Sequence, residues 1–249
     1  YDSTFEGLMT AVFEVFEYKY DVVEIVAQQN YSQENFFAET HEVITDFTKS
    51  DRVLKKLEEN LGKQGISQLM MVYFSERKDL ERLILSAVWH SIKHPKQNIL
   101  QDFGNEDILE ISKICRSVSR ERHRMLAFVR FELLQDEVYF AKIEPDFNVL
   151  PLIRKHFKER YADQKWMIFD LKRHYGIFYD LKEVHFFTPD SSQLQNFRNS
   201  EQFHHEEEKK YQKLWQRYFV KTGIPERKNM KLHIQWVPKR YWKYLTEKY

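Results

Sequence analysis

The fold is decided by two neighbouring stretches, Ala127-Phe-Val-Arg-Phe-Glu-Leu-Leu134 and Val138-Tyr-Phe-Ala-Lys-Ile143. Each alternates with a period of two residues, which is typical of a β-strand with one buried face. The short polar stretch Gln135-Asp-Glu137 between them predicts a turn. We therefore expect the two stretches to form a β-hairpin.

The residues that follow extend this pattern. Apolar side chains at helical spacing predict a helix over about 147–161, directly after Pro145 and Asp146. Three more strands are predicted over 166–170, 175–180 and 184–188, the first two joined by Leu171-Lys-Arg-His174. The order β-β-α-β-β-β favours an α+β fold with a central antiparallel sheet and a helix on its face.

Helices are expected on both sides of the sheet. They are predicted over 4–19, with Ser3 and Glu6 as a capping box, then over 51–62, 66–74, 79–93 and 105–124, and finally over 203–221 and 225–249. Gly62 and Gly65 are expected to break a helix, residues 22–26 to form a short strand, and 193–202 a loop. The chain thus divides into a mainly helical N-terminal part (1–115), a central α+β sheet unit (116–190) and a basic helical C-terminal part (191–249). No flexible linker separates these parts, which favours one compact body.

Charge is unevenly distributed, although the net charge is only +1. Residues 1–60 carry five basic and thirteen acidic side chains, whereas residues 209–249 carry twelve basic and two acidic ones. Such a split indicates that the basic end binds a polyanion. The alternative is that an acidic region and a basic region simply pack together.

The composition excludes several classes of protein. A single cysteine, Cys115, can form neither an internal disulfide nor an iron–sulfur cluster by itself, which favours a reducing cytoplasm. No apolar run approaches the ~20 residues needed to span a membrane, and no secretory signal is visible. Glycine-rich dinucleotide and P-loop motifs are absent. His90 and His94, or the stretch His204-His-Glu-Glu-Glu208, have spacings that could bind a metal, but neither pattern is specific, and we expect no metal or cofactor.

The basic C-terminal part predicts a nucleic-acid interface, because Lys and Arg bind phosphates while flat rings stack on unpaired bases. Its densest stretch is Lys239-Arg-Tyr-Trp-Lys-Tyr244. A second basic cluster, with Arg116, Arg120, His123 and Arg124, lies on one face of a predicted helix. For the C-terminal stretch, the alternative is that Tyr241 and Trp242 pack on the body while the cations stay solvated. For the second cluster, the alternative is a solvated face or ion pairs with Glu121 and the acidic N-terminal region. The predicted nucleic-acid-binding residues are Arg116, Arg120, Arg124, Arg227, Lys239, Arg240, Tyr241, Trp242 and Lys243.

Acidic and basic side chains also gather at the ends and turns of the predicted sheet, where they could perform general acid–base chemistry. Asp146 is equally suited to cap the helix that follows it, and the turn before Tyr175 can be a plain hairpin turn. The candidate catalytic residues are Glu144, Asp146, Asp170, Lys172, Arg173 and His174.

Several long motifs resemble one bacterial family. They are Tyr1-Asp-Ser-Thr-Phe-Glu-Gly-Leu-Met-Thr-Ala-Val-Phe-Glu14, His123-Arg-Met-Leu-Ala-Phe-Val-Arg-Phe131, Tyr139-Phe-Ala-Lys-Ile-Glu-Pro-Asp-Phe-Asn-Val-Leu-Pro-Leu-Ile153, Arg160-Tyr-Ala-Asp-Gln-Lys-Trp166, Asp170-Leu-Lys-Arg-His-Tyr-Gly-Ile-Phe-Tyr-Asp180, Ile224-Pro-Glu-Arg-Lys-Asn229 and Pro238-Lys-Arg-Tyr-Trp-Lys-Tyr-Leu-Thr-Glu247. The chain resembles proteins described as probable DNA metabolism or repair proteins. The resemblance implies a radical-SAM protein of DNA modification or repair as a neighbour, and some relatives are fused to a uracil-DNA-glycosylase-like domain. It implies no catalytic residues. One departure is Ser3, where the family often has glycine.

We therefore expect a DNA metabolism or repair accessory protein that binds single-stranded or damaged DNA and acts with a radical-SAM partner. An enzyme acting on a base or a phosphodiester through the central sheet unit is the alternative. An RNA-binding protein with the same surfaces and a scaffold that contacts only a protein partner stay open as well.

Overall fold

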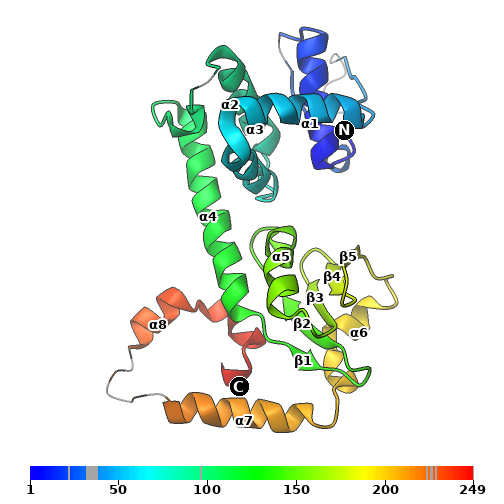
Figure 1. Ribbon diagram of the computed structural model, residues 1–249, viewed down its shortest axis with the longest axis vertical. Coiled ribbons are helices and arrows are strands. Elements are labelled where there is room, and N and C mark those ends of the chain that lie inside the picture. The colour runs from blue at the N-terminus through cyan, green and yellow to red at the C-terminus, as the bar shows by residue number, and fades with distance from the viewer. Residues whose placement is uncertain are drawn as a thin grey trace. The chain divides into compact units, whose positions relative to one another are not determined.

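The computed structural model describes residues 1–21, 23–31, 39–95, 97–222, 224, 227 and 229–248 (Figure 1). Contacts along the chain divide it into two compact units, Tyr1–Ser119 (unit 1) and Arg120–Tyr249 (unit 2). Residues 120–190 of the expected central part and all of the expected C-terminal part therefore lie in unit 2. None of the helices among the described residues is both long enough and apolar enough to cross a membrane.

Unit 1 is helical, as predicted. Its elements are α1 (Phe5–Glu17), the 3-10 helix η1 (Gln28–Asn30), α2 (Phe47–Tyr73), α3 (Leu80–Lys93), the 3-10 helix η2 (Ile99–Gln101) and the first part of α4 (Glu106–Phe128). The side-chain carbonyl oxygen of Asn105 caps α4 by accepting bonds from the backbone N–H groups of Asp107 and Ile108. The expected strand at 22–26 does not form over its described residues 23–26, and Val22 lies outside the described residues.

Two local predictions in unit 1 are corrected. The cap of α1 is Thr4, whose side chain accepts the Gly7 N–H at 2.9 Å, and not Ser3. Ser3 has a φ of 65°, a left-handed conformation that glycine adopts with less strain. Gly62 does interrupt α2, with a φ of 68°, but Gly65 is a buried helical residue.

Unit 2 contains a five-stranded sheet with the order β1-β2-β3-β4-β5. Its elements are β1 (Glu132–Leu133), β2 (Tyr139–Ile143), α5 (Leu150–Arg160), β3 (Trp166–Asp170), β4 (Tyr175–Tyr179) and β5 (Val184–Phe187). This confirms the α+β class and the β-β-α-β-β-β order. The first strand is much shorter than predicted because α4 continues to Phe128, whose ring packs against Tyr241 with centroids 5.4 Å apart.

The sheet is mixed and not purely antiparallel as expected. β2 and β3 run parallel, while the other three pairs are antiparallel. The reason is that α5 crosses from the end of β2 back to the start of β3, and such a crossover joins parallel strands. The register pairs Ile143 with Asp170, so the loop after β2 and the turn after β3 begin at the same edge of the sheet. The six candidate catalytic residues lie at this edge.

Aromatic side chains cover the sheet on both faces. The ring of Phe157 from α5 lies 6.1 Å from Trp166 on one face. On the other face Phe197, from α6 (Leu194–Arg198), stacks on Phe169 with ring centroids 4.7 Å apart. The predicted loop over 193–202 therefore contains a short helix, because Phe197 is needed to cover this face.

The rest of unit 2 is helical. It comprises the 3-10 helix η3 (Ser200–Phe203), α7 (Glu208–Thr222), α8 (Met230–Trp236) and the 3-10 helices η5 (Lys239–Tyr244) and η6 (Thr246–Lys248). Glu247 ties the segment formed by η5 and η6, called the C-terminal segment below, to α7 and to the stretch between α4 and β1. Its carboxylate accepts bonds from Trp215 of α7 at 2.9 Å and from both Nε and Nη2 of Arg130 at 3.2 and 2.7 Å.

Candidate nucleic-acid interface

Side chains of the β3–β4 turn donate hydrogen bonds to the backbone of the loop that follows β2. Arg173 donates to the carbonyl oxygens of Pro145 at 3.2 Å and Asp146 at 3.1 Å, and the Lys172 ammonium donates to the Asp146 carbonyl at 3.0 Å. Asp170 is fully buried and accepts from the Arg173 guanidinium at 2.9 Å. Burial raises the pKa of Asp170 above its ordinary value, even though Arg173 opposes this shift. These charges therefore fix the backbone of the loop.

A second carboxylate, Glu121 of α4, anchors the C-terminal segment. Glu121 is only 1% exposed and accepts bonds from the Tyr241 hydroxyl, from Arg240 at 3.0 Å and from the Asp146 backbone N–H at 3.0 Å. Burial raises the pKa of Tyr241, and the hydrogen bond to Glu121 raises it further. Arg124, one turn along α4, lies 3.6 Å from the same carboxylate. Buried carboxylates need such donors because a bare charge in the interior is costly.

Two further ion pairs lie at the surface of this group. Arg240 contacts the Asp146 carboxylate at 2.6 Å, and Lys243 contacts the Glu144 carboxylate at 2.5 Å. Tyr244 also donates to Glu144 at 2.7 Å, and the bonds from Lys243 and Tyr244 lower the pKa of Glu144. The complete set, called the ion-pair cluster below, has five cations and four carboxylates: Glu121, Arg124, Glu144, Asp146, Asp170, Lys172, Arg173, Arg240 and Lys243.

The ion-pair cluster unites residues from two groups that lie far apart in the sequence, the candidate catalytic residues and the predicted nucleic-acid-binding residues. Five of the six candidate catalytic residues lie in it, together with three of the predicted nucleic-acid-binding cations. The sixth, His174, has a φ of 56° and contacts Arg198 at 3.2 Å instead. The carboxylates accept bonds from neighbouring cations and backbone groups, which gives them a structural role. Catalysis by these residues stays a prediction.

The remaining predicted interface residues are distributed differently. The ring of Tyr241 is buried, and Trp242 is half-buried with its indole N–H bonded to the Val237 carbonyl at 3.0 Å, so neither offers a fully open stacking face. Exposed side chains, by contrast, are found at Arg116 in unit 1 and at Arg120, Arg227 and Lys239 in unit 2.

A row of cations of the basic C-terminal part lies along α7, although none of them is among the predicted interface residues. Lys209, Lys213, Arg217 and Lys221 recur every four residues along α7, and Lys210 lies beside them. At about 100° per residue these five side chains, the α7 basic face, occupy an arc of roughly 120°. All five are exposed, and none has an ion pair with any residue that the structure describes.

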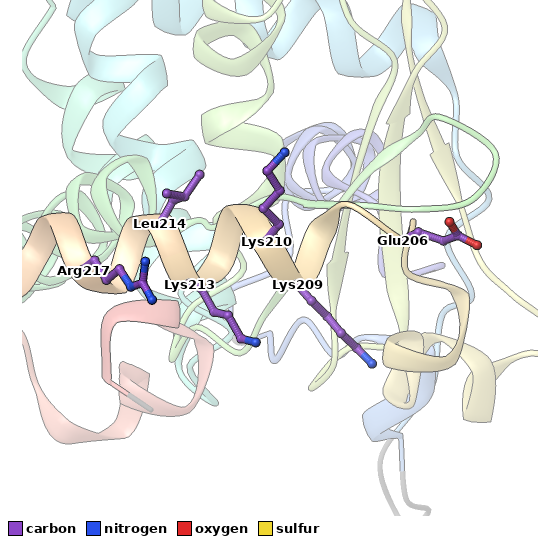
Figure 2. A pocket seen from close by; sticks show the side chains of 6 residues that line it. All are labelled: Glu206, Lys209, Lys210, Lys213, Leu214 and Arg217. Carbon is purple, nitrogen blue, oxygen red and sulfur yellow. The ribbon is translucent and has the colours of Figure 1, made fainter.

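An open pocket of about 380 Å³ lies along this face (Figure 2). Figure 2 shows Lys209 and Lys213 extending from one side of α7, and Lys210 and Leu214 from another. Glu206 and Arg217 complete the lining. Four of the six residues that line this open pocket are therefore cationic.

The other side of α7 packs onto the C-terminal segment. Gln216 donates to the Thr246 carbonyl at 3.1 Å, and the Lys248 ammonium lies 5.0 Å from the Phe219 ring centroid. Together with the bond from Trp215 to Glu247, these contacts leave the α7 basic face turned away from the packed side.

Two tyrosines border the α7 basic face. Tyr211 is 51% exposed and Tyr218 is 60% exposed, and both lie between the basic arc and the packed side of the helix. Tyr218 stacks on Trp215 with ring centroids 5.7 Å apart, which supports its ring in a fixed position. Cations and flat rings thus share one accessible surface.

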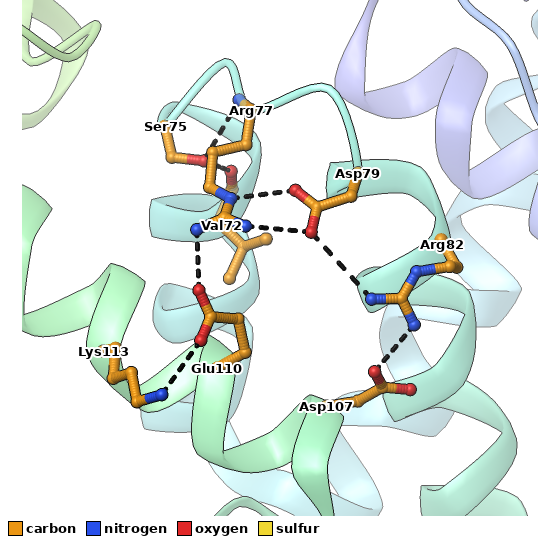
Figure 3. Close-up of polar contacts among 8 residues, drawn as sticks. All are labelled: Val72, Ser75, Arg77, Asp79, Arg82, Asp107, Glu110 and Lys113. Carbon is orange, nitrogen blue, oxygen red and sulfur yellow. Dashed lines mark hydrogen bonds and ion pairs between the residues drawn. The ribbon is translucent and has the colours of Figure 1, made fainter.

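Unit 1 shows how cations are arranged when their role is structural (Figure 3). Arg77 reaches Asp79 at 2.8 Å and Glu110 at 2.7 Å, and Arg82 reaches Asp107 at 2.7 Å. Figure 3 shows Lys113 joining the same network through Glu110, so every cation drawn has a carboxylate partner. The α7 basic face has no such partners in the described part of the chain.

The histidine pairs do not assemble a metal site among the described residues, where no group of three or more His, Cys, Asp or Glu side chains could hold an ion. His90 pairs with Asp102 at 3.1 Å, and its ring lies beside His94. His204 pairs with Glu132 at 3.0 Å.

These features define an α+β protein in which a mixed sheet and an ion-pair cluster fix the C-terminal segment, and a helix presents exposed cations and exposed rings. Residues 78–247 match the family model of a domain of unknown function, DUF4130, and the chain belongs to this family. The match includes the whole ion-pair cluster and all of α7. No curated protein and no solved structure matches the chain.

Proposed function

We propose that the chain is a nucleic-acid-binding accessory protein of DNA metabolism or repair, and that it holds single-stranded or damaged DNA along the α7 basic face. The observation that carries the proposal is the row of five exposed cations without carboxylate partners among the described residues, bordered by Tyr211 and Tyr218. Clusters of unneutralised Lys and Arg attract phosphates, and exposed rings stack on bases that are not paired.

The spacing along α7 supports a strand that follows the helix. A rise of 1.5 Å per residue separates successive cations by about 6 Å, close to the spacing of phosphates along an extended strand. Tyr211 and Tyr218 are separated along the axis by about 10 Å. Stacking on these rings requires splayed bases, which favours single-stranded or damaged DNA over an intact duplex.

The choice of DNA, and of a radical-SAM protein as partner, rests on the resemblance of the sequence to the DNA metabolism and repair proteins. Binding to DNA and RNA strands of the same sequence at matched salt tests the first choice. Co-purification of the chain with a radical-SAM protein of the kind that the resemblance implies tests the second.

The interface is tested by fluorescence anisotropy with a labelled single strand at several salt concentrations. Lys209→Gln, Lys213→Gln and Arg217→Gln together should weaken binding and reduce the slope of log affinity against log salt by about 2, at about 0.7 per lost phosphate contact. The matched control replaces three exposed lysines of unit 1, Lys55, Lys63 and Lys78, by glutamine. The proposal fails if the natural chain binds no oligonucleotide, or if the triple change on α7 alters the slope no more than the control.

A further inference from the structure

The outer ion pairs of the ion-pair cluster differ from its interior in exposure. The side chains of Lys243 and Glu144 are 60% and 40% exposed, and those of Arg240 and Asp146 are 43% and 51% exposed. The Glu121 side chain is only 2% exposed. The outer pairs therefore meet solvent, while the inner carboxylate does not.

The C-terminal segment does not depend on the outer pairs to stay in place. Tyr241 is buried, its hydroxyl is bonded to Glu121, and Glu247 holds Arg130 and Trp215. Breaking the contacts to Glu144 and Asp146 would therefore leave η5 and η6 docked.

We propose that Arg240 and Lys243 form a second phosphate-binding site, masked by the carboxylates of Glu144 and Asp146, which occupy the positions of two phosphates. This inference rests on the proposed function. When a nucleic-acid strand binds, two of its phosphates replace these carboxylates, and the loop after β2 turns its acids to solvent. The loop thus acts as an internal competitor for the strand.

The balance of energies permits this exchange. Exposed ion pairs contribute little to stability, so a phosphate loses little by displacing a carboxylate, and it releases condensed counterions from the strand as it binds. The net charge of the ion-pair cluster also favours this exchange. With all four carboxylates in place its net charge is +1, and without those of Glu144 and Asp146 it is +3.

The test neutralises the competitor. Glu144→Gln with Asp146→Asn should tighten binding of a labelled single strand between roughly twofold and thirtyfold, the range expected when two exposed ion pairs no longer have to be broken. The salt slope should steepen by at most about 1.4, at about 0.7 for each of the two phosphate contacts, because the natural chain forms these contacts only in those complexes in which the carboxylates have been displaced. The matched control, Glu183→Gln with Asp163→Asn, removes two exposed carboxylates of unit 2 that have no ion pair with a described residue.

A second pair of variants tests whether the gain comes through Lys243. Lys243→Gln should remove much of the gain in the Glu144→Gln, Asp146→Asn background, and it should weaken binding less in the natural chain, where a phosphate must first displace Glu144 from this cation. Unfolding midpoints of all variants verify that η5 and η6 stay docked.

The outcomes separate the two proposals. If the natural chain binds through α7 but the double variant gains no more than its control, the masked site is wrong and the proposed function stands. If the natural chain binds no strand, both fail. A gain that Lys243→Gln leaves intact overturns the assignment of Lys243.

Discussion

Removing the hydroxyl of Tyr241 is the sharpest test of how the C-terminal segment is held. Tyr241→Phe keeps the buried ring and its contact with Phe128 but deletes the hydrogen bond that the hydroxyl donates to Glu121 and the one that it accepts from Arg240. Glu121 would keep its bonds from Arg240 and from the Asp146 N–H, and one lone pair of a buried carboxylate would lose its donor.

The expected loss of stability follows from the charge on the acceptor. A hydrogen bond to an ionised group contributes about 1.5–3 kcal/mol, more than a neutral one. Tyr244→Phe is the matched control, because the same chemical change removes a bond to Glu144, which is 40% exposed. Solvent replaces that bond, so the control should cost less than about 1 kcal/mol.

Urea unfolding followed by tryptophan fluorescence measures both variants. Four of the five tryptophans, Trp166, Trp215, Trp236 and Trp242, lie in unit 2, so the signal reports mainly on that unit. With a urea dependence of about 1–3 kcal/mol per M, Tyr241→Phe should lower the midpoint by about 1 M. A midpoint no lower than that of Tyr244→Phe would refute the idea that Glu121 anchors the segment.

Two further predictions concern the sheet and the end of the chain. Gly176→Ala should destabilise unit 2 by about 1–3 kcal/mol in the same assay, because the added Cβ would lie 2.4 Å from the Phe187 ring and 2.9 Å from the Ile168 carbonyl oxygen. Gly104→Ala is the control and should change stability little, because its Cβ meets nothing closer than 3.4 Å. Burial alone would raise the pKa of Glu247, but bonds from Arg130 and Trp215 bring this pKa below its ordinary value. The ionised Glu247 therefore contributes its full stabilisation above about pH 5, and this contribution is lost as the pH falls below the unfolded pKa of about 4.3. The difference in unfolding free energy between the natural chain and Glu247→Gln should therefore be larger at pH 7 than at pH 3, and an equal difference at both would contradict this assignment.

The sequence by itself determined the elements whose local signals agree with their packing. The apolar periods of α1, α3 and α5, the alternation in β2 and the runs of apolar and aromatic residues in β3 to β5 predicted helices and strands close to those observed. The basic C-terminal part was also visible, because charge is a property of composition. The position of Glu121 carried a signal too, since it falls among Ile114, Val118 and Met125 on the apolar side of α4, where a carboxylate must find buried donors.

Only the tertiary structure decided which of the cations are neutralised. Arg217 and Arg240 cannot be distinguished by sequence, because the carboxylate that neutralises a cation can lie far away along the chain: Glu121 lies 119 residues before Arg240. The parallel pairing of β2 with β3 likewise follows from the crossover and not from the strands themselves. That pairing brings the loop after β2 and the turn after β3 to one edge, where they meet the C-terminal segment, while α7 keeps its cations exposed to solvent.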